Sequence, residues 1–402
     1  MGRYVSTIAA PGSPTRAELT ALPPLSLYIH LPWCVKKCPY CDFNSHALRE
    51  GIPERRYVDA LIADLDHELP NVWGRRVTSV FFGGGTPSLF AAEAIDEVLC
   101  AVRARIALDP SAEITLEANP GTVDMEKFEG FARAGVNRLS LGIQSFNDTH
   151  LKALGRIHDS NEARRAIEIA RATFENINLD LMFALPNQSL ADCEKDIETA
   201  LSFGAPHLSM YHLTLEPNTL FHRDPPPVPD DELAADMHAK VIECLGAAGF
   251  ENYETSAHAK SGHACRHNLN YWNFGDYLGI GAGAHGKMSF ADRIVRTVKH
   301  KHPETYMQRA VMGEAAQETR DVTTAELPFE FMLNALRLSS GFPLTQFAER
   351  TGLGLESILH ALNQAEARGL IDRDHRVVRP TEKGRLFLND LLELFLGEDR
   401  KL

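Results

Sequence analysis

Three closely spaced cysteines constrain this chain more than any other feature of its sequence. Cys34, Cys38 and Cys41 form a C-x3-C-x2-C pattern just after a short apolar run. Thiolates are the ligands that iron–sulfur clusters require, and three of them can bind three irons of one [4Fe–4S] cluster. Because no fourth cysteine is nearby, the fourth iron is left open. The pattern therefore predicts a cluster that also binds a substrate or cofactor, rather than one that only carries electrons.

Two alternatives fit the same three cysteines. A structural zinc site needs four ligands, usually two C-x2-C pairs, and the chain has no second pair close by, although His46 could supply a fourth ligand. Three unrelated buried thiols are the other alternative. The ligand count favours the cluster over zinc.

Length and composition exclude several classes of protein. A chain of 402 residues with 44% hydrophobic and 24% charged residues is typical of a globular protein with two or three domains, or one large barrel with an appendage. The net charge of −13 argues against nucleic acid as a partner. Seven cysteines, three of them clustered, do not suggest a disulfide framework, so we expect a reducing, cytoplasmic location.

Membrane insertion is not expected from the sequence. The first ~25 residues lack the apolar core of a signal peptide. No run approaches the ~18 apolar residues that a transmembrane helix needs. Peripheral association with a membrane stays open.

Apolar strand-like runs alternate with helical patterns over residues 25–250. The predicted strands are residues 25–30, 77–82, 113–118, 138–143, 177–183 and 207–213. Such alternation predicts an α/β fold with a parallel sheet and helical crossovers. A partly closed barrel and an open doubly wound sheet both fit, and both bind ligands at the carboxyl ends of their strands.

The chain divides into four predicted segments. They are a flexible lead-in (1–24), the βα region (25–250), an extension (251–325) and a helix-rich, winged-helix-like module (326–402). Winged helices often bind DNA, but this module is rich in acidic residues and lacks a basic recognition surface. We expect it to pack on the rest of the protein or to act as a lid.

Polar and glycine residues follow the predicted strands where each strand ends. The first strand leads to the cysteine loop, the second to Gly83-Gly84-Gly85-Thr86-Pro87, the third to Glu117, and the fifth carries Asp180. Because the carboxyl ends of parallel strands meet at one edge, these groups predict a single site there. Charged groups late in apolar strands are costly unless they are paired or bind a ligand. The glycine run either lets a ligand approach the backbone or forms a tight turn.

A second cluster is the segment His267-Asn268-Leu269-Asn270-Tyr271-Trp272. It could hold a flat aromatic ligand, and histidine is a common axial ligand of heme iron. The alternative is an aromatic turn that packs on the barrel's flank. Residues 279–285, rich in glycine, are predicted to form a close-packed strand or loop near the ligand.

With these motifs placed, nearly the whole chain from Leu25 onward resembles the HemN/HemW branch of the radical S-adenosylmethionine (SAM) superfamily. The matching motifs are Tyr28 six residues before Cys34, Gly-Gly-Gly-Thr-Pro, Glu117-x-Asn-Pro, Gly142-x-Gln144-Ser, Leu154-Gly-Arg156 and Asp180-Leu-Met. The resemblance implies a partial (βα)6 TIM-like barrel, a [4Fe–4S] cluster on the three cysteines, and SAM bound at the open iron. It also implies SAM contacts from Tyr28, Tyr40, Gly84, Gly85, Thr86, Glu117, Gln144, Arg156 and Asp180. From the residues alone, a surface salt bridge is the favoured interpretation of Arg156.

Two features distinguish members within this branch. Phe43 stands where the oxygen-independent coproporphyrinogen III oxidases have a further cysteine, and the His-Asn-x-x-Tyr-Trp motif is typical of the branch's heme chaperones. The resemblance implies that the protein binds heme and passes it to heme-accepting proteins, some of them at the cytoplasmic face of the membrane. It implies heme contacts from His267, Asn268, Tyr271 and Trp272. Oxidative decarboxylation of coproporphyrinogen III, and radical SAM chemistry on another small molecule, remain the alternatives.

Overall fold

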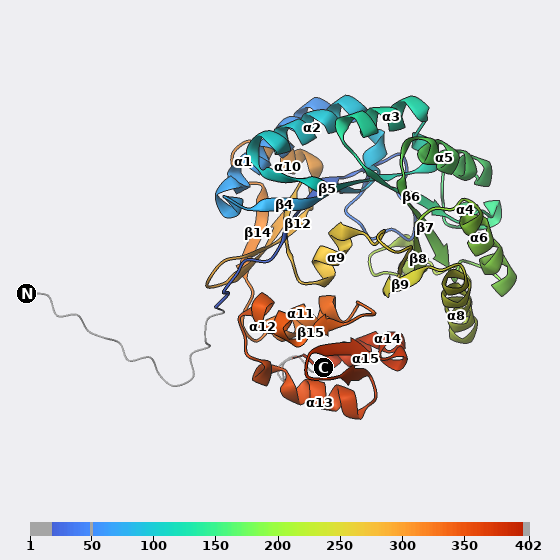
Figure 1. Cartoon of the computed structure of the whole chain (residues 1–402). Helices are drawn as coiled ribbons and strands as arrows, with labels where there is room; N and C mark the ends of the chain where they lie inside the picture. The colour runs from blue at the N-terminus through green and yellow to red at the C-terminus, as the bar shows by residue number, and fades with distance from the viewer. Residues whose placement is uncertain (1–17, 49–50, 397–402) are drawn as a thin grey trace, which may run out of the picture.

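The computed structural model describes residues 18–48 and 51–396, arranged as a large α/β part and a smaller C-terminal module (Figure 1). Residues 1–17 of the predicted lead-in lie outside the described residues. Each part has its own cluster of buried apolar side chains. No helix in the described ranges is long and apolar enough to cross a membrane.

One twelve-stranded sheet forms the large part. Its parallel strands run, in spatial order, β11 (Asp276–Ile280), β1 (Leu25–Leu31), β4 (Arg76–Gly84), β5 (Ala107–Ala118), β6 (Arg138–Gln144), β7 (Asn176–Phe183) and β8 (His207–His212). Antiparallel strands extend both edges: β12 (His285–Ser289), β13 (Ile294–Lys299) and β14 (Ala316–Asp321) beyond β11, and β10 (Ala257–Ala259) and β9 (Glu251–Glu254) beyond β8. Within the described residues β1 and β8 do not pair, so the six predicted strands form a partial barrel, which confirms the predicted fold class.

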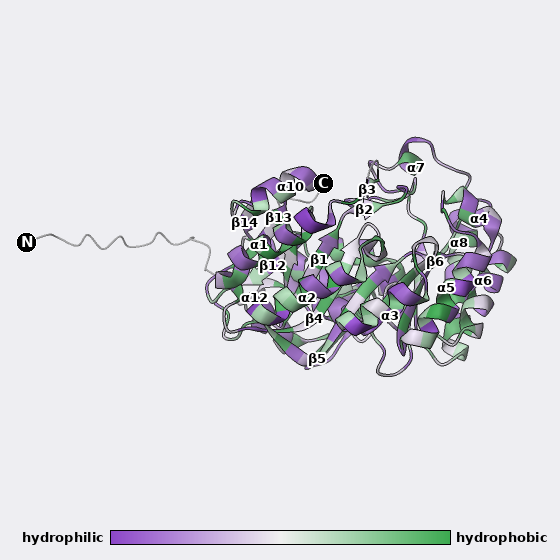
Figure 2. Ribbon diagram, turned by 90° about the horizontal axis from the view of Figure 1, so that it is seen from above, coloured by the Kyte–Doolittle hydropathy of each residue, from purple (hydrophilic) through white to green (hydrophobic). Residues whose placement is uncertain are grey.

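Helices follow the parallel strands and lie around the outside of the sheet, as the view from above shows (Figure 2). They are α1 (Glu54–Val72), α2 (Ala92–Arg105), α3 (Met125–Ala134), α4 (Asp148–Ala153), α5 (Ser160–Thr173), α6 (Leu190–Ser202) and α8 (Asp231–Ala247). The short helix α7 (Leu220–Arg223) lies instead at the cysteine loop, where the Phe221 N–H donates to the Pro39 carbonyl (3.0 Å). In α1, Tyr57, Leu61 and Leu65 are buried at a spacing of four residues, which places them on one face against the sheet. Capping boxes begin α5 and α6, at Asp159 and Ser189.

The alternation of residues along the strands decides what faces the inside of the barrel. On β7, Leu179 and Leu181 are fully buried, whereas Asn178 and Asp180 share the other face and are hydrogen-bonded to each other. Ser140 of β6 bonds to both of them across the strands. The interior face of the sheet is therefore polar, and this face holds the site.

The segment with the His-Asn-x-x-Tyr-Trp motif forms helix α9 (Arg266–Trp272), which lies within the curve of the sheet (Figure 1, yellow). It packs against β1, β4 and β11. The alternative of an aromatic turn on the barrel's flank is therefore wrong. The glycine-rich segment before β12 is close-packed as predicted, because a Cβ added at Gly281 would lie 2.3 Å from the His30 carbonyl oxygen of β1.

Helix α10 (Pro303–Ala310) packs on α1, and the C-terminal module follows β14. The module contains α11 (Leu327–Ala335), α12 (Leu344–Thr351), α13 (Leu359–Ala367), α14 (Glu382–Leu386), α15 (Leu388–Glu393) and a sheet in the order β15 (Phe342–Pro343), β17 (Val377–Pro380), β16 (Ile371–Arg373). Phe331 packs on Phe274, just after α9, with ring centroids 5.6 Å apart. The module therefore abuts the end of the helix that carries the second motif.

Candidate functional site

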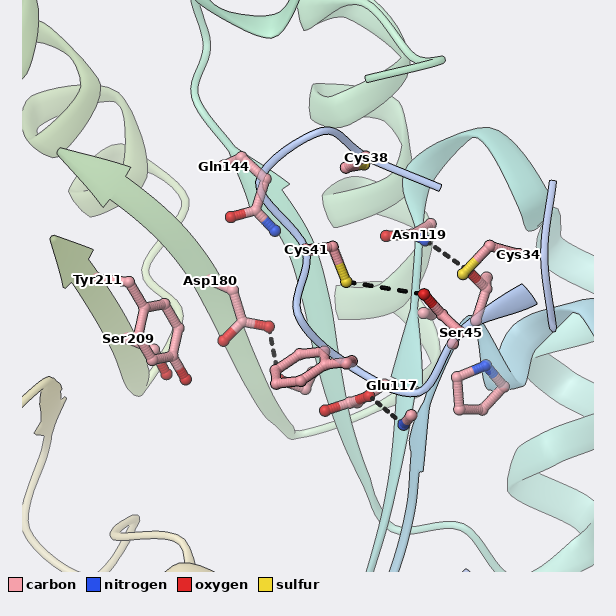
Figure 3. A pocket seen from close by; sticks show the side chains of 18 of the residues that line it. Cys34, Cys38, Cys41, Ser45, Glu117, Asn119, Gln144, Asp180, Ser209 and Tyr211 are labelled. Atoms are coloured by element: carbon pink, nitrogen blue, oxygen red, sulfur yellow. Dashed lines mark hydrogen bonds between the residues drawn. The ribbon is translucent and has the colours of Figure 1, made fainter. Parts of the chain in front are cut away.

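A cavity of about 630 Å³ runs from the cysteine loop, at the carboxyl ends of the strands, to helix α9. Residues from nearly every parallel strand line it, as the close view shows for ten labelled side chains (Figure 3). The structure brings together the three cysteines, all of the predicted SAM contacts, and His267, Asn268 and Tyr271 of the predicted heme contacts. Trp272 is not among the lining residues.

The cysteine loop is held in place between the ends of β1 and β4. The short strands β2 (Trp33–Cys34) and β3 (His46–Ala47) pair with each other, and the Cys41 N–H donates to the Cys38 carbonyl (3.2 Å). Each thiol also has a polar neighbour: Thr86 at 3.5 Å from Cys34, Ser45 of the same loop at 3.8 Å from Cys41, and Arg156 at 3.7 Å from Cys38. Hydrogen-bond donors and a cation beside the sulfurs suit an anionic cluster.

The donor geometry fits a cluster better than a single metal ion. Across the described ranges no three His, Cys, Asp or Glu side chains are placed to hold one ion. His46, the candidate fourth zinc ligand, does not line the cavity and lies beside His302, with ring centroids 5.9 Å apart. Three thiols that face one cavity without converging on a point fit a [4Fe–4S] cluster, in which each cysteine binds a different iron.

The glycine run packs tightly against the cysteine loop. Gly84 has a φ of 116°, and a Cβ there would lie 2.5 Å from the His30 ring. A Cβ at Gly85 would lie 2.5 Å from the Trp33 carbonyl oxygen. The Gly84 N–H donates to the Glu117 carboxylate (3.2 Å). The glycines are therefore required to bring the backbone of β4 against the cysteine loop and Glu117.

Glu117 and Asp180 face the cavity from β5 and β7 (Figure 3). Burial, together with the charge of Asp180, raises the pKa of Glu117 to about 8. Burial also raises the pKa of Asp180, while hydrogen bonds from Ser140 and Asn178 (both 2.8 Å) oppose that shift. Two such carboxyl groups can accept hydrogen bonds from ligand hydroxyl or ammonium groups.

Gln144 and Arg156 occupy the rim of the cavity near Cys38. Gln144 has a φ of 69°, a backbone conformation that costs free energy for a residue with a side chain and is often kept at functional sites. Arg156 donates to the Asn119 side chain (2.6 Å) and to the Gly142 carbonyl (2.7 Å). The alternative of a surface salt bridge for Arg156 is wrong, because its partners are these cavity groups and Cys38.

His267 lies at the opposite end of the cavity from the cysteine loop. Its ring is 1% exposed, packs against Phe81 and Tyr271 with centroids 5.0 Å away, and places Nδ1 3.0 Å from the Ser79 hydroxyl. Its buried Nε2 has no hydrogen-bond partner among the described residues. Burial, aided by the charge of Arg138, lowers the pKa of His267 to about 3. The imidazole is therefore neutral, as iron ligation requires.

The other residues of the second motif are placed differently from one another. Asn268 and Tyr271 line the cavity. The Trp272 ring instead lies under the guanidinium of Arg337, 4.3 Å from its centroid, at the contact with the C-terminal module. Cys265 is buried with its thiol 3.5 Å from the Glu113 carboxylate, outside the cavity lining.

Sequence reasoning missed a group of polar residues on the interior face of the sheet. Arg138, Ser140, Asn178, His207 and Ser209 line the cavity between Asp180 and α9. The signal was present, because polar residues alternate with apolar ones in β6, β7 and β8. These strands looked uniformly buried because their apolar residues dominate the pattern.

The raised pKa of Glu117 gives a testable pH dependence. The folded chain holds a proton that the unfolded chain releases above about pH 4.5, so this contribution to stability is present at low pH and is lost as the pH rises through about 8. We expect Glu117→Gln to lose less stability than the natural chain between about pH 5 and about pH 9. Thermal unfolding across that range measures the difference, with the exposed Glu126→Gln as control. Parallel curves for the natural chain and Glu117→Gln would show that Glu117 does not titrate this way.

Known protein families and solved structures have the same architecture. A model of the Radical SAM superfamily matches residues 28–200, and a model of the HemN C-terminal domain matches residues 322–387. A solved structure of the Escherichia coli coproporphyrinogen III oxidase HemN superposes with a TM-score of 0.79 at 22% identity, over 93% of this chain and 90% of that one, so the two share a fold.

Similar curated proteins cover nearly the full chain. The "Heme chaperone HemW" of Escherichia coli is 50% identical over 94% of this chain and 100% of its own length. The Bacillus subtilis protein of the same name is 36% identical over 93% of this chain and 99% of its own. The mouse "Radical S-adenosyl methionine domain-containing protein 1, mitochondrial" is 35% identical over 98% of this chain and 91% of its own length. The chain therefore belongs to the HemW family of the radical SAM superfamily, a family that implies a [4Fe–4S] cluster and SAM.

Proposed function

We propose that this protein is a heme chaperone, which binds heme and passes it to heme-accepting proteins. The observation that carries the proposal is 50% identity, over 94% of the chain, to a relative named for that activity. The proposed place of action is the cytoplasm, with acceptors that include proteins at the cytoplasmic face of the membrane.

The cluster and SAM would occupy the upper part of the cavity. Cys34, Cys38 and Cys41 would hold the [4Fe–4S] cluster, and the open iron would be bound by SAM. The SAM contacts proposed are Tyr28, Tyr40, Gly84, Gly85, Thr86, Glu117, Gln144, Arg156 and Asp180, all of which line the cavity. These residues would orient both groups, and a reduced cluster would supply the electron if bound SAM is cleaved.

His267 is the proposed heme contact, with Asn268 and Tyr271 beside it. Its neutral imidazole and unpartnered Nε2 support the proposal. Because Nε2 is buried, heme would reach it only after α9 or the rings of Phe81 and Tyr271 move. Trp272 would join the contact only if Arg337 left its ring.

The mouth of the cavity is apolar, which suits a heme macrocycle. Phe43 is 61% exposed, and Val35 and Ile157 are each 46% exposed, and all three line the opening. Large apolar side chains exposed together on a soluble surface commonly mark a binding site. Here they surround the entrance to the cysteine loop.

A heme transfer experiment tests the proposal. The protein is reconstituted with iron and sulfide under anaerobic conditions, loaded with heme, and mixed with a b-type cytochrome stripped of its heme. We expect saturable binding of one heme per chain, followed by recovery of the cytochrome spectrum. Heme-loaded serum albumin, which binds heme without dedicated transfer, is the matched control donor. No saturable binding, or transfer no faster than from albumin, would contradict the proposal.

A further inference from the structure

The end of the cavity nearest α9 contains a buried cation without a partner. Arg138 begins β6, is 2% exposed and lines the cavity. Its buried Nε has no hydrogen-bond partner, and no ion pair or hydrogen bond to its guanidinium is found among residues 18–48 and 51–396. A buried charge without a partner is unfavourable, so this arrangement indicates that something else completes it.

The nearby carboxylates act on Arg138 only from a distance. Glu113 and Asp180 are the two carboxylates whose charges act on it, beside the Cys265 thiol and the Tyr253 hydroxyl. Glu113 already accepts hydrogen bonds from the Cys265 thiol (3.5 Å) and the backbone N–H of His267 (3.2 Å). Asp180 is held by Ser140 and Asn178. Glu113 Oε1 and both oxygens of Asp180 therefore already have other donors, and Arg138 lines the cavity.

The surroundings of Arg138 are organised in advance. His207 Nδ1 lies 2.6 Å from the Asn178 side-chain oxygen, and the Ser209 hydroxyl donates to the same oxygen (3.1 Å). These bonds fix the polar groups on β7 and β8. Aromatic rings also border this part of the cavity. The ring centroids of Phe81 and His267 are 5.0 Å apart, and those of Tyr28 and Phe81 are 6.3 Å apart. Polar groups and stacked rings therefore border the same space.

We propose that this end of the cavity binds the carboxylate of a ligand with an aromatic ring system, and that Arg138 is its cation. A guanidinium fork matches a carboxylate with two parallel hydrogen bonds. The negative charges of Glu113 and Asp180 nearby disfavour a dianion such as phosphate and favour a group with one charge. The adjacent rings suit an aromatic body.

Two sources offer the same chemistry: a carboxylate side chain of heme, and a separate small aromatic acid. The site itself does not depend on heme transport, because it rests on Arg138 and its surroundings. The experiment therefore uses a small probe, benzoate, beside heme and its dimethyl ester, in which both carboxylates are blocked.

The first measurement is the melting temperature of the unliganded protein. Arg138→Met keeps most of the side-chain volume and removes the unpaired charge, so we expect its melting temperature to equal or exceed that of the natural chain. Arg165→Met, on the exposed side of α5, is the matched control and should leave the melting temperature unchanged. A clear drop for Arg138→Met alone would show that Arg138 is a structural ion-pair partner and would overturn the proposal.

The second measurement is binding. We expect benzoate to bind the natural chain, to bind Arg138→Met about 10- to 100-fold more weakly, and to bind Arg138→Lys with intermediate affinity. If heme is the source of the carboxylate, its dimethyl ester should bind the natural chain more weakly than heme by the same factor. In Arg138→Met, heme and the ester should then bind with equal affinity. If a separate acid is the source, heme and its ester bind alike while the dependence of benzoate on Arg138 remains. If benzoate does not bind, or binds all variants with equal affinity, the proposal is overturned. Water would then be the partner of the Arg138 guanidinium. Failure of heme to bind at all contradicts only the chaperone function.

Discussion

Replacement of Cys38 by serine is expected to remove the iron–sulfur cluster and, with it, most of the SAM affinity. Only three cysteines face the cavity in the described structure, so the variant retains two thiolate ligands for four irons. A serine hydroxyl is a poor substitute, because iron–sulfur clusters require soft thiolates. Iron and acid-labile sulfide should fall from about four of each per chain to near zero after anaerobic reconstitution. Chemical analysis of both elements, and equilibrium binding of SAM, measure the result.

The matched control for this experiment is Cys100→Ser. Cys100 is exposed on α2, and its thiol donates to the Asp96 carboxylate, at 3.8 Å. This variant should keep the full complement of iron and sulfide. A Cys38→Ser protein that still bound four irons would show that the chain uses another ligand and that the assignment of the loop is wrong.

Replacement of His267 by alanine is expected to weaken heme binding by about 100-fold or more. Loss of a group that only orients a metal ligand costs about 10- to 100-fold in affinity, and loss of the ligand itself costs at least as much. The heme spectrum should change as well, because the axial ligand governs it. Anaerobic heme titrations followed by absorbance measure the affinity and the spectrum together.

Two further variants separate ligation from packing. His267→Gln keeps a polar side chain of similar size next to Ser79 but cannot replace imidazole as a strong iron ligand, so its heme affinity should fall like that of alanine. His263→Ala, four residues earlier and outside the cavity, should bind heme normally. Loss of the hydrogen bond between the His267 ring and Ser79 should by itself lower the free energy of unfolding by only about 1 kcal/mol, which thermal unfolding would register. An unchanged heme spectrum and affinity in His267→Ala would remove this residue from the site.

The barrel and the upper site were predictable from the sequence, because each depends on local patterns. The apolar strands alternate with helices, and their functional residues stand at strand ends, so topology alone brings Gly84, Glu117 and Asp180 together. These residues end successive parallel strands, so their order along the chain is enough to place them next to one another. The spacing of the three cysteines was enough to predict an iron–sulfur cluster.

The lower half of the cavity was not predictable in the same way. Helix α9 is far in sequence from β1 and β4, against which it packs, and nothing in its composition indicates which way it turns. Because of its position, His267 and Tyr271 line the cavity, whereas the Trp272 ring packs against the guanidinium of Arg337. Arg138 begins an apolar strand, where a charged residue usually indicates an exposed strand end. Only the packing of α9 across the barrel shows that it is buried.

Heme carriage and porphyrinogen oxidation can be compared directly in one sample of the protein. The reconstituted protein, supplied with SAM and a reductant under anaerobic conditions, is given heme in one aliquot and coproporphyrinogen III in the other. We expect one heme bound per chain and no accumulation of decarboxylated product beyond that of a Cys38→Ser control. Repeated turnover of coproporphyrinogen III to protoporphyrinogen, without saturable heme binding, would contradict the proposed heme chaperone function.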